Sequence, residues 1–175
     1  VSPDGRVFVA DTGNKRIAVF DSNGNYLTEF GRPGFGKGEF DEPVAVALSA
    51  NGLVYVTDTW NQRVQSFAGS ADGAVYLPLQ EWPIAGWYGT SVENKPFIAV
   101  NPLNNNVLVT DPEGFRVLEF TSEGAFVRSW GQFGQGTDGF AMPSGIAVDA
   151  QGRVWVSDGV NGETANNRIL RFTLP

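Results

Sequence analysis

Four aspartates are the clearest candidates for metal or substrate binding, because each stands at the same place in a repeated pattern. Each one closes a short apolar segment, and an arginine follows it; the pairs are Asp11 with Arg16, Asp58 with Arg63, Asp111 with Arg116, and Asp158 with Arg168. Converging carboxylates could bind Ca²⁺ or a substrate, since hard cations prefer oxygen ligands. An aspartate before a tight turn can instead accept hydrogen bonds from the turn and from the arginine. Because the pair recurs in every repeat, we favour the structural role and expect no cofactor, with Ca²⁺ as the alternative.

Aromatic side chains gather where the chain departs from this pattern. The segment 81–88 replaces a glycine-rich loop, and an insertion lies at 160–165. The candidate ligand-binding residues in and beside these segments are Trp60, Trp82, Trp87, Tyr88, Asn161 and Glu163. The rings could form a platform for a peptide or a sugar. The alternative is that they fill gaps between sheets, as we expect of Trp130 and Trp155, which lie within apolar segments.

Composition excludes several classes of site. The 175 residues include no Cys and no His, which excludes a disulfide framework, zinc-finger ligands and Ser-His-Asp or Cys-His catalysis. The net charge is −7 and the 12 basic residues are scattered, so nucleic acid is not an expected partner. The longest apolar run, 44–48, is far shorter than the roughly 20 residues that span a bilayer, so we expect no direct membrane insertion of this segment.

Short β-strands are the elements that must position these residues. The Asp-ending segment recurs four times, roughly every 50 residues, and no stretch shows a sustained helical period. Strands are expected before each Asp segment, beginning at Pro43, Pro96 and Pro143, and further strands after each Asp-to-Arg turn. The sequence therefore predicts an all-β chain of four-stranded antiparallel meanders, which is typical of β-propeller blades. The predicted units are 1–42, 43–95, 96–142 and 143–175.

The consecutive motifs identify a resemblance. Pro-x-Gly-Ile-Ala-Val, Val-x-Val-x-Asp, Asn-x-Arg-Ile/Val-x-x-Phe and Gly-x-Phe-Gly-x-Gly together resemble the NHL repeat, most closely at 11–17 and 58–64. The third unit lacks the Asn, so we expect a differently shaped turn at 111–116. The family usually closes about six blades, whereas this chain supplies about four, with incomplete first and last blades. We therefore expect a fragment whose open blade faces could drive self-association.

The resemblance also implies a function. Many NHL-repeat proteins are non-catalytic scaffolds, so we expect recognition of a protein or carbohydrate ligand through loops on one propeller face, with no catalytic residues. The long connections 31–43, 83–96 and 131–143 should share that face with the four Asp–Arg turns.

Two other functions are weighed against this expectation. One is a lactonase-like hydrolase or lyase with a carboxylate-bound metal, although related amidating lyases depend on histidines, which this chain lacks. The other is RNA binding, which is known for relatives with basic faces and is disfavoured here by the acidic charge. Bacterial propellers of this kind are often parts of larger extracytoplasmic proteins, which implies a location outside the cytoplasm.

Overall fold

The chain is built almost entirely of β-strands in the computed structural model, which describes residues 1–87, 95–161 and 164–174. Side chains at 161, 164 and 165 are not among those described. One short 3₁₀ turn, Thr12–Asn14, is the helical segment of this part of the chain. Within the same residues, no helix is both long and apolar enough to cross a membrane.

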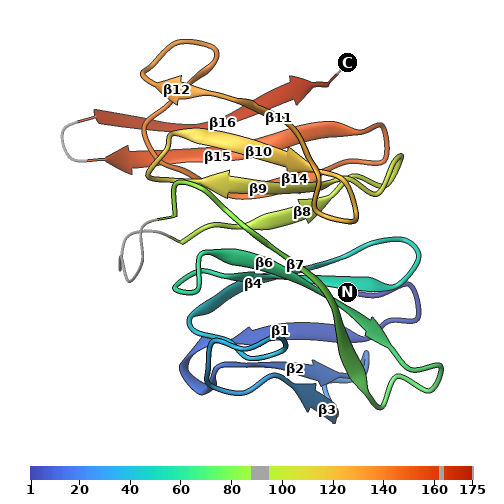
Figure 1. Ribbon diagram of the computed structural model, residues 1–175. Coiled ribbons are helices and arrows are strands. Elements are labelled where there is room, and N and C mark those ends of the chain that lie inside the picture. Colours follow the sequence, from blue (N-terminus) through green and yellow to red (C-terminus); the bar gives the residue numbers. More distant parts are fainter. Residues whose placement is uncertain (88–94, 162–163, 175) are drawn as a thin grey trace. The chain divides into compact units, whose positions relative to one another are not determined.

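Four antiparallel sheets follow one another along the chain (Figure 1). The first holds β1 (Val7–Asp11), β2 (Arg16–Phe20) and β3 (Tyr26–Phe30). The second holds β4 (Pro43–Leu48), β5 (Leu53–Asp58), β6 (Arg63–Gly69) and β7 (Tyr76–Pro83). The third holds β8 (Ile98–Val100), β9 (Val107–Asp111), β10 (Arg116–Phe120) and β11 (Phe126–Trp130). The fourth holds β14 (Pro143–Val148), β15 (Arg153–Asn161) and β16 (Thr164–Thr173).

Each strand pairs with the next one in the sequence, so every sheet is a meander. The second and third sheets have four strands, and the first and fourth have three. A short parallel pair, β12 (Gln132–Phe133) and β13 (Gly139–Phe140), lies in the connection before β14. The prediction of an all-β chain of propeller blades, with incomplete first and last blades, is confirmed.

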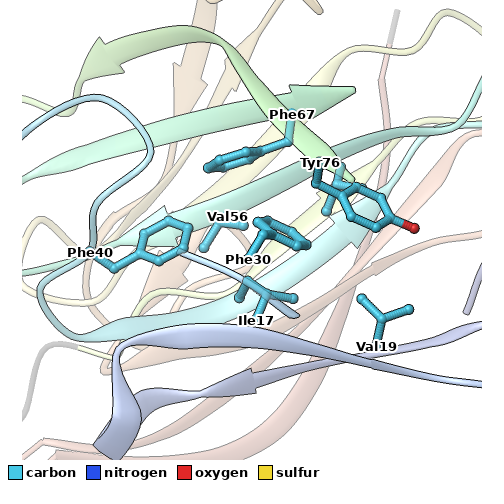
Figure 2. Packing of buried hydrophobic residues seen from close by; sticks show 8 residues of the cluster. Ile17, Val19, Phe30, Phe40, Val56, Phe67 and Tyr76 are labelled. Carbon is cyan, nitrogen blue, oxygen red and sulfur yellow. The ribbon is translucent and has the colours of Figure 1, made fainter. Parts of the chain in front are cut away.

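Two compact units divide the chain, Val1–Ala85 and Gly86–Pro175, and each contains two of the sheets. In the first unit, alternate residues of the first sheet face the second sheet, because successive side chains of a strand point to opposite sides. Figure 2 shows the resulting cluster, which includes Ile17, Val19, Phe30, Phe40, Val56, Phe67 and Tyr76. The rings of Phe30 and Tyr76 stack with centroids 4.7 Å apart. Full burial of each large apolar side chain contributes roughly 1.5–3 kcal/mol, so this cluster holds the two sheets together.

The second unit has an equivalent core between its two sheets. Leu108, Val117, Phe140, Val154 and Val156 are its fully buried apolar residues. Trp130 packs against this cluster, as expected, with its ring centroid 5.9 Å from that of Phe172.

The expectation that Trp155 belongs to the core is wrong, since this residue is 38% exposed. Its neighbours in β15, Val154 and Val156, take the inward positions, so strand alternation turns Trp155 to the opposite side. There its Nε1 donates a hydrogen bond to Asp149, and the Arg171 guanidinium lies over the ring at 5.8 Å.

The turn after β14 predicts a pH effect on stability. Asp149 accepts hydrogen bonds from the backbone of Gln151 and Arg153, both at 3.0 Å, and from Arg153 Nε at 2.6 Å. Burial acts to raise the pKa of Asp149, but the hydrogen bonds from Arg153 outweigh it, and the pKa falls from 3.8 to about 2. A carboxyl whose pKa is lowered on folding stabilises the protein above its unfolded pKa and loses that contribution as the pH falls.

We therefore expect Asp149→Asn to lower the urea midpoint at neutral pH. The difference from the unsubstituted protein should close as the pH falls from about 4 to about 2, because the native carboxyl is then protonated as well. Urea titrations across this range measure the effect. A difference that stays constant with pH would show that the carboxylate charge is not its source.

Candidate functional site

The four aspartates lie directly opposite their arginines across a hairpin. The antiparallel register pairs Asp11 with Arg16, Asp58 with Arg63, Asp111 with Arg116, and Asp158 with Arg168. In chain order, the distances from arginine Nε to aspartate Oδ2 are 2.9, 2.8, 2.8 and 3.3 Å. Each carboxylate is thus held by the guanidinium of its own repeat. No group of three or more acidic residues within the described part of the chain is arranged to hold a metal ion.

All four turns have a residue in the left-handed backbone conformation at the same place. The residue before each arginine has a positive φ; these residues are Lys15 (54°), Gln62 (55°), Phe115 (54°) and Asn167 (46°). The third turn keeps this left-handed residue, and it differs in its donor: the N–H of Gly114 donates to Asp111 at 3.1 Å where other turns use an Asn side chain.

The insertion in the fourth turn is absorbed as a longer hairpin. A bulge after Asp158 and the extra residues of β15 and β16 restore the register, so that Asp158 still faces Arg168. The ion pair is kept although the sequence between its partners is longer.

The aspartate of the Asp–Arg pair differs in burial between repeats, and the direction of its pKa shift differs with it. Asp58 is fully buried, and burial raises its pKa although Asn61, the Asp41 N–H and Arg63 all donate to it. Asp11 is half-buried, and hydrogen bonds from Asn14 and Arg16 lower its pKa instead. A buried carboxylate loses hydration that its partners must replace. The Asp58 site therefore depends more strongly on its donors than the Asp11 site does.

Arg63 also holds the long loop that precedes its sheet. Its Nη1 donates to the carbonyl of Phe35 at 3.0 Å, and its Nη2 donates to the carbonyls of Gly36 at 2.8 Å and Glu39 at 2.9 Å. Asn61 Nδ2 donates to the Gly34 carbonyl and to Asp58, both at 2.9 Å. We call Asp58, Asn61 and Arg63 the first clip, and the loop 31–42 the first tip loop. A planar guanidinium with several donors suits this role, because it can hold several acceptors at fixed angles.

The second unit contains a second clip, formed by Asp158, Asn166 and Arg168. Arg168 donates to the carbonyls of Gln135, Gly136 and Gly139 at 2.8, 2.8 and 2.7 Å. Asn166 donates to Asp158 and to the Gly134 carbonyl at 2.9 Å. These carbonyls belong to the loop 131–142, which we call the second tip loop.

The two tip loops share the backbone conformation of their first halves and differ further on, where Gly38 and Glu42 have positive φ values (81° and 59°) and Asp138 and Met142 do not. Gly34 and Gly134 have φ values of 152° and 153°, and each donates its N–H to a phenylalanine carbonyl, Phe40 or Phe140, at 3.1 Å. Gly31 also has a positive φ, and a Cβ there would lie 2.2 Å from the Phe40 ring. The core phenylalanine and the clip therefore fix each loop from both sides.

The two tip loops differ in their exposed side chains at three matching positions. Where the first tip loop has Arg32, Phe35 and Lys37, the second has Gln132, Gln135 and Thr137 at matching positions. Phe35 is 78% exposed although its carbonyl is fixed by Arg63. The first tip loop borders a hollow of about 480 Å³, and Arg63 lines another of about 200 Å³ beside Trp82. A loop with a fixed backbone and exposed, variable side chains has the properties of a recognition loop.

The aromatic platform expected around segment 81–88 is not formed by the tryptophans. Trp87 is fully buried and Trp82 is 6% exposed, with its ring 6.3 Å from that of Tyr55. These rings fill interior space, which is the alternative that burial favours. Trp60 is half-buried, and its backbone N–H donates to the Asp41 carbonyl at 3.0 Å. Tyr88 and Glu163 lie outside the described residues, and Asn161 is described only as the last residue of β15.

Two contributors escaped the sequence analysis. Gln65 is fully buried, accepts from the Gly38 N–H at 2.8 Å and donates to the Glu39 carbonyl at 2.8 Å, so it adds to the first clip. Phe35 was passed over because it lies among glycines that the repeat itself requires. Alignment of the two tip loops, with attention to the residues between the glycines, would have singled it out.

Comparisons with known proteins agree with this architecture. A family model for the NHL repeat matches residues 1–20, 40–67 and 140–172. The E3 ubiquitin-protein ligase TRIM32 of Homo sapiens is 27% identical over 180 residues, covering 96% of this chain and 25% of that protein. Protein brain tumor of Drosophila melanogaster is 28% identical over 132 residues, covering 75% of this chain and 12% of that protein. The chain thus spans a quarter or less of these relatives.

Solved structures share the fold at low sequence identity. Virginiamycin B lyase from Staphylococcus aureus superposes with a TM-score of 0.63 at 17% identity, covering 100% of this chain and 54% of that chain. A nidogen/laminin complex gives a TM-score of 0.65 at 18% identity, covering 98% of this chain and 57% of that chain. Likeness at this level of identity supports the fold alone.

Proposed function

This chain is an NHL-repeat β-propeller, and from that premise we propose that it is a non-catalytic binding module that recognises a protein through its first tip loop. The observation that carries the proposal is the contrast between the two tip loops. Equivalent clips hold the carbonyls of both loops, while the exposed residues at three matching positions change from Arg32, Phe35 and Lys37 to Gln132, Gln135 and Thr137. The second tip loop also has an exposed phenylalanine, Phe133, but the Phe133 ring packs 4.9 Å from that of Phe115. Phe35 makes no such ring contact with the described residues, and binding would account for its exposure on a fixed loop.

The chemistry of the first tip loop favours a protein ligand over a carbohydrate. Interface hot spots are enriched in aromatic residues and arginine, and Phe35 and Arg32 bring both to one loop. One similar protein is also named for a protein substrate: TRIM32 is a ubiquitin-protein ligase. A fixed loop lowers the entropic cost of binding, because little backbone freedom is lost.

Replacement of these three side chains by those of the second tip loop tests this proposal. We expect peptides selected from a random library on the whole chain to bind the triple variant Arg32→Gln, Phe35→Gln, Lys37→Thr about 30-fold more weakly, which is the loss of one hot spot. The introduced residues occur at the matching positions of the second tip loop, which a clip holds in the same way, so the fold should be unchanged, which thermal unfolding can verify. Fluorescence anisotropy with labelled peptides measures the affinity.

The matched control changes the second tip loop in the same way. The variant Gln132→Ala, Gln135→Ala, Thr137→Ala should bind the selected peptides as the unsubstituted chain does. If the library yields no binder, or if binders tolerate the first variant and not the control, the first tip loop is not the recognition surface.

An enzymatic role has weaker support. The lyase structures resemble this chain at 17–18% identity, which concerns fold only. A histidine-to-alanine variant of the staphylococcal virginiamycin B lyase is described as catalytically inactive, and the 175 residues of this chain include no histidine. The repeated aspartates, which could have served a metal-dependent reaction, are each bound by an arginine. We therefore propose no reaction.

A further inference from the structure

We propose that the hollow beside Lys37 is a carboxylate subsite that receives an aspartate or glutamate side chain of the protein partner. The inference rests on the proposed function and specifies the chemistry of the ligand. The hollow, of about 480 Å³, lies within the first unit, where the first tip loop meets β3 and β7. Its lining residues are Glu29, Phe30, Gly31, Arg32, Lys37, Gly38, Glu39 and Pro78.

The two acidic residues of the hollow are already engaged. Glu39 accepts from the Gly36 N–H and from Arg32 Nε, both at 2.9 Å, and these two donors lower the pKa of Glu39. Glu29 pairs with Arg16 and accepts from the Tyr26 hydroxyl at 2.9 Å. Both carboxylates therefore have cationic or polar partners of their own, and neither needs Lys37.

Lys37 is the cation of this hollow without a carboxylate partner. Its Nζ donates to the Leu79 carbonyl at 2.6 Å, and no carboxylate among the described residues lies within ion-pair distance of it. The carbonyl is neutral, so it fixes the position of the ammonium without balancing its charge. An ammonium has three N–H donors, and only one is used here. A carboxylate is the ligand that would use the others and neutralise the charge.

The backbone around Lys37 is held in place. Gly38 follows it with a φ of 81°, and a Cβ at that position would lie 3.1 Å from the Pro78 ring. The Gly38 N–H donates to the buried Gln65, and the Arg63 guanidinium holds the neighbouring Gly36 carbonyl. A fixed cation recognises an anion with less entropic cost than a mobile surface lysine does.

A protein carboxylate fits this surface better than a nucleic-acid phosphate. The chain carries a net charge of −7, which repels a polyanion at long range, whereas a single acidic side chain needs only one local cation. Phe35 lies two residues before Lys37 and is 78% exposed, so the partner segment should combine an apolar residue with an acidic one. Thr137 takes the place of Lys37 in the second tip loop, which should therefore lack this preference.

The test measures the coupling between Lys37 and acidic residues of the library-selected peptides. Lys37→Met removes the charge while keeping a long apolar side chain. We expect it to weaken binding of these peptides about 10-fold, which corresponds to one charge-assisted hydrogen bond. Replacement of the acidic peptide residue by its amide should weaken binding to the unsubstituted chain by a similar factor. The two changes together should cost little more than either alone, because they remove the same contact.

The outcomes separate this inference from the proposed function. If peptides depend on Phe35 but their acidic residues can be amidated without loss, the recognition surface stands and the carboxylate subsite is wrong. If no peptide binds, the proposed function fails first. A uridine homopolymer tests whether the hollow binds phosphate instead. The inference is overturned if the homopolymer binds, Lys37→Met abolishes this binding, and acidic peptides do not bind.

Discussion

Replacement of Arg63 by methionine should lower the free energy of unfolding by about 3–5 kcal/mol. The substitution leaves the fully buried carboxylate of Asp58 without its cation, and it removes the guanidinium hydrogen bonds to three backbone carbonyls of the first tip loop, of which the Glu39 carbonyl keeps its bond from Gln65. Removal of one partner from a buried ion pair is strongly destabilising because the other charge remains buried. Urea or thermal unfolding of the whole chain measures the loss.

Two controls identify the cause of this loss. Arg32→Met removes an arginine that is paired with Glu39 but whose side chain is 78% exposed, so it should cost less than about 1 kcal/mol. The deficit of Arg63→Met should also shrink as the pH falls towards 4, since burial raises the pKa of Asp58 and protonation removes the uncompensated charge. Equal losses for the two variants at every pH would refute the role of the clip.

A second large effect is expected at Arg128. This residue pairs with Glu119, a fully buried carboxylate of β10, at 2.7 Å. Asn106 donates to the other carboxylate oxygen at 2.7 Å. Arg128→Met should destabilise the protein by about 3 kcal/mol, because the buried Glu119 carboxylate then loses its cationic partner. Thermal unfolding in parallel with the unsubstituted chain gives the difference.

Replacement of the acidic partner, Glu119, should lower the free energy of unfolding much less. Glu119→Leu leaves Arg128, whose side chain is 32% exposed and can turn towards water, and it puts an apolar residue where the first sheet has Val19. The double variant Glu119→Leu, Arg128→Met should therefore be about as stable as Glu119→Leu alone. Additive losses in this cycle would mean that the two side chains act independently.

The prediction of the fold from the sequence rested on the regularity of the repeat. The spacing from Asp58 to Arg63 predicted a turn in which carboxylate and guanidinium meet, and the strand register brings them together. Trp155 shows the limit of such reasoning. An apolar segment indicates a strand but not which of its sides is covered, so Trp155 was placed in the core when only Val154 and Val156 belong there.

The candidate site was harder to predict for a different reason. Arg63 recognises carbonyl oxygens of residues 35, 36 and 39, and every residue type supplies a carbonyl. No residue pattern in the loop could therefore reveal its partner. Trp82 and Trp87 drew attention because they break the repeat, whereas Phe35 lies within a segment that obeys it. Aromatic residues that break the repeat are therefore buried here, whereas an aromatic residue that lies within the repeat is exposed.

The recognition of main-chain carbonyls by Arg63 also has an evolutionary consequence. Because each clip binds the main chain, substitutions at 32, 35 and 37 leave the anchoring bonds of the first tip loop in place. Under the proposed function, stability depends on the main chain of this loop and specificity on its side chains, so point mutations could change the ligand without compensating changes in the core. A loop anchored in this way is an exchangeable cassette, and new specificities could be installed on it by exchanging three side chains.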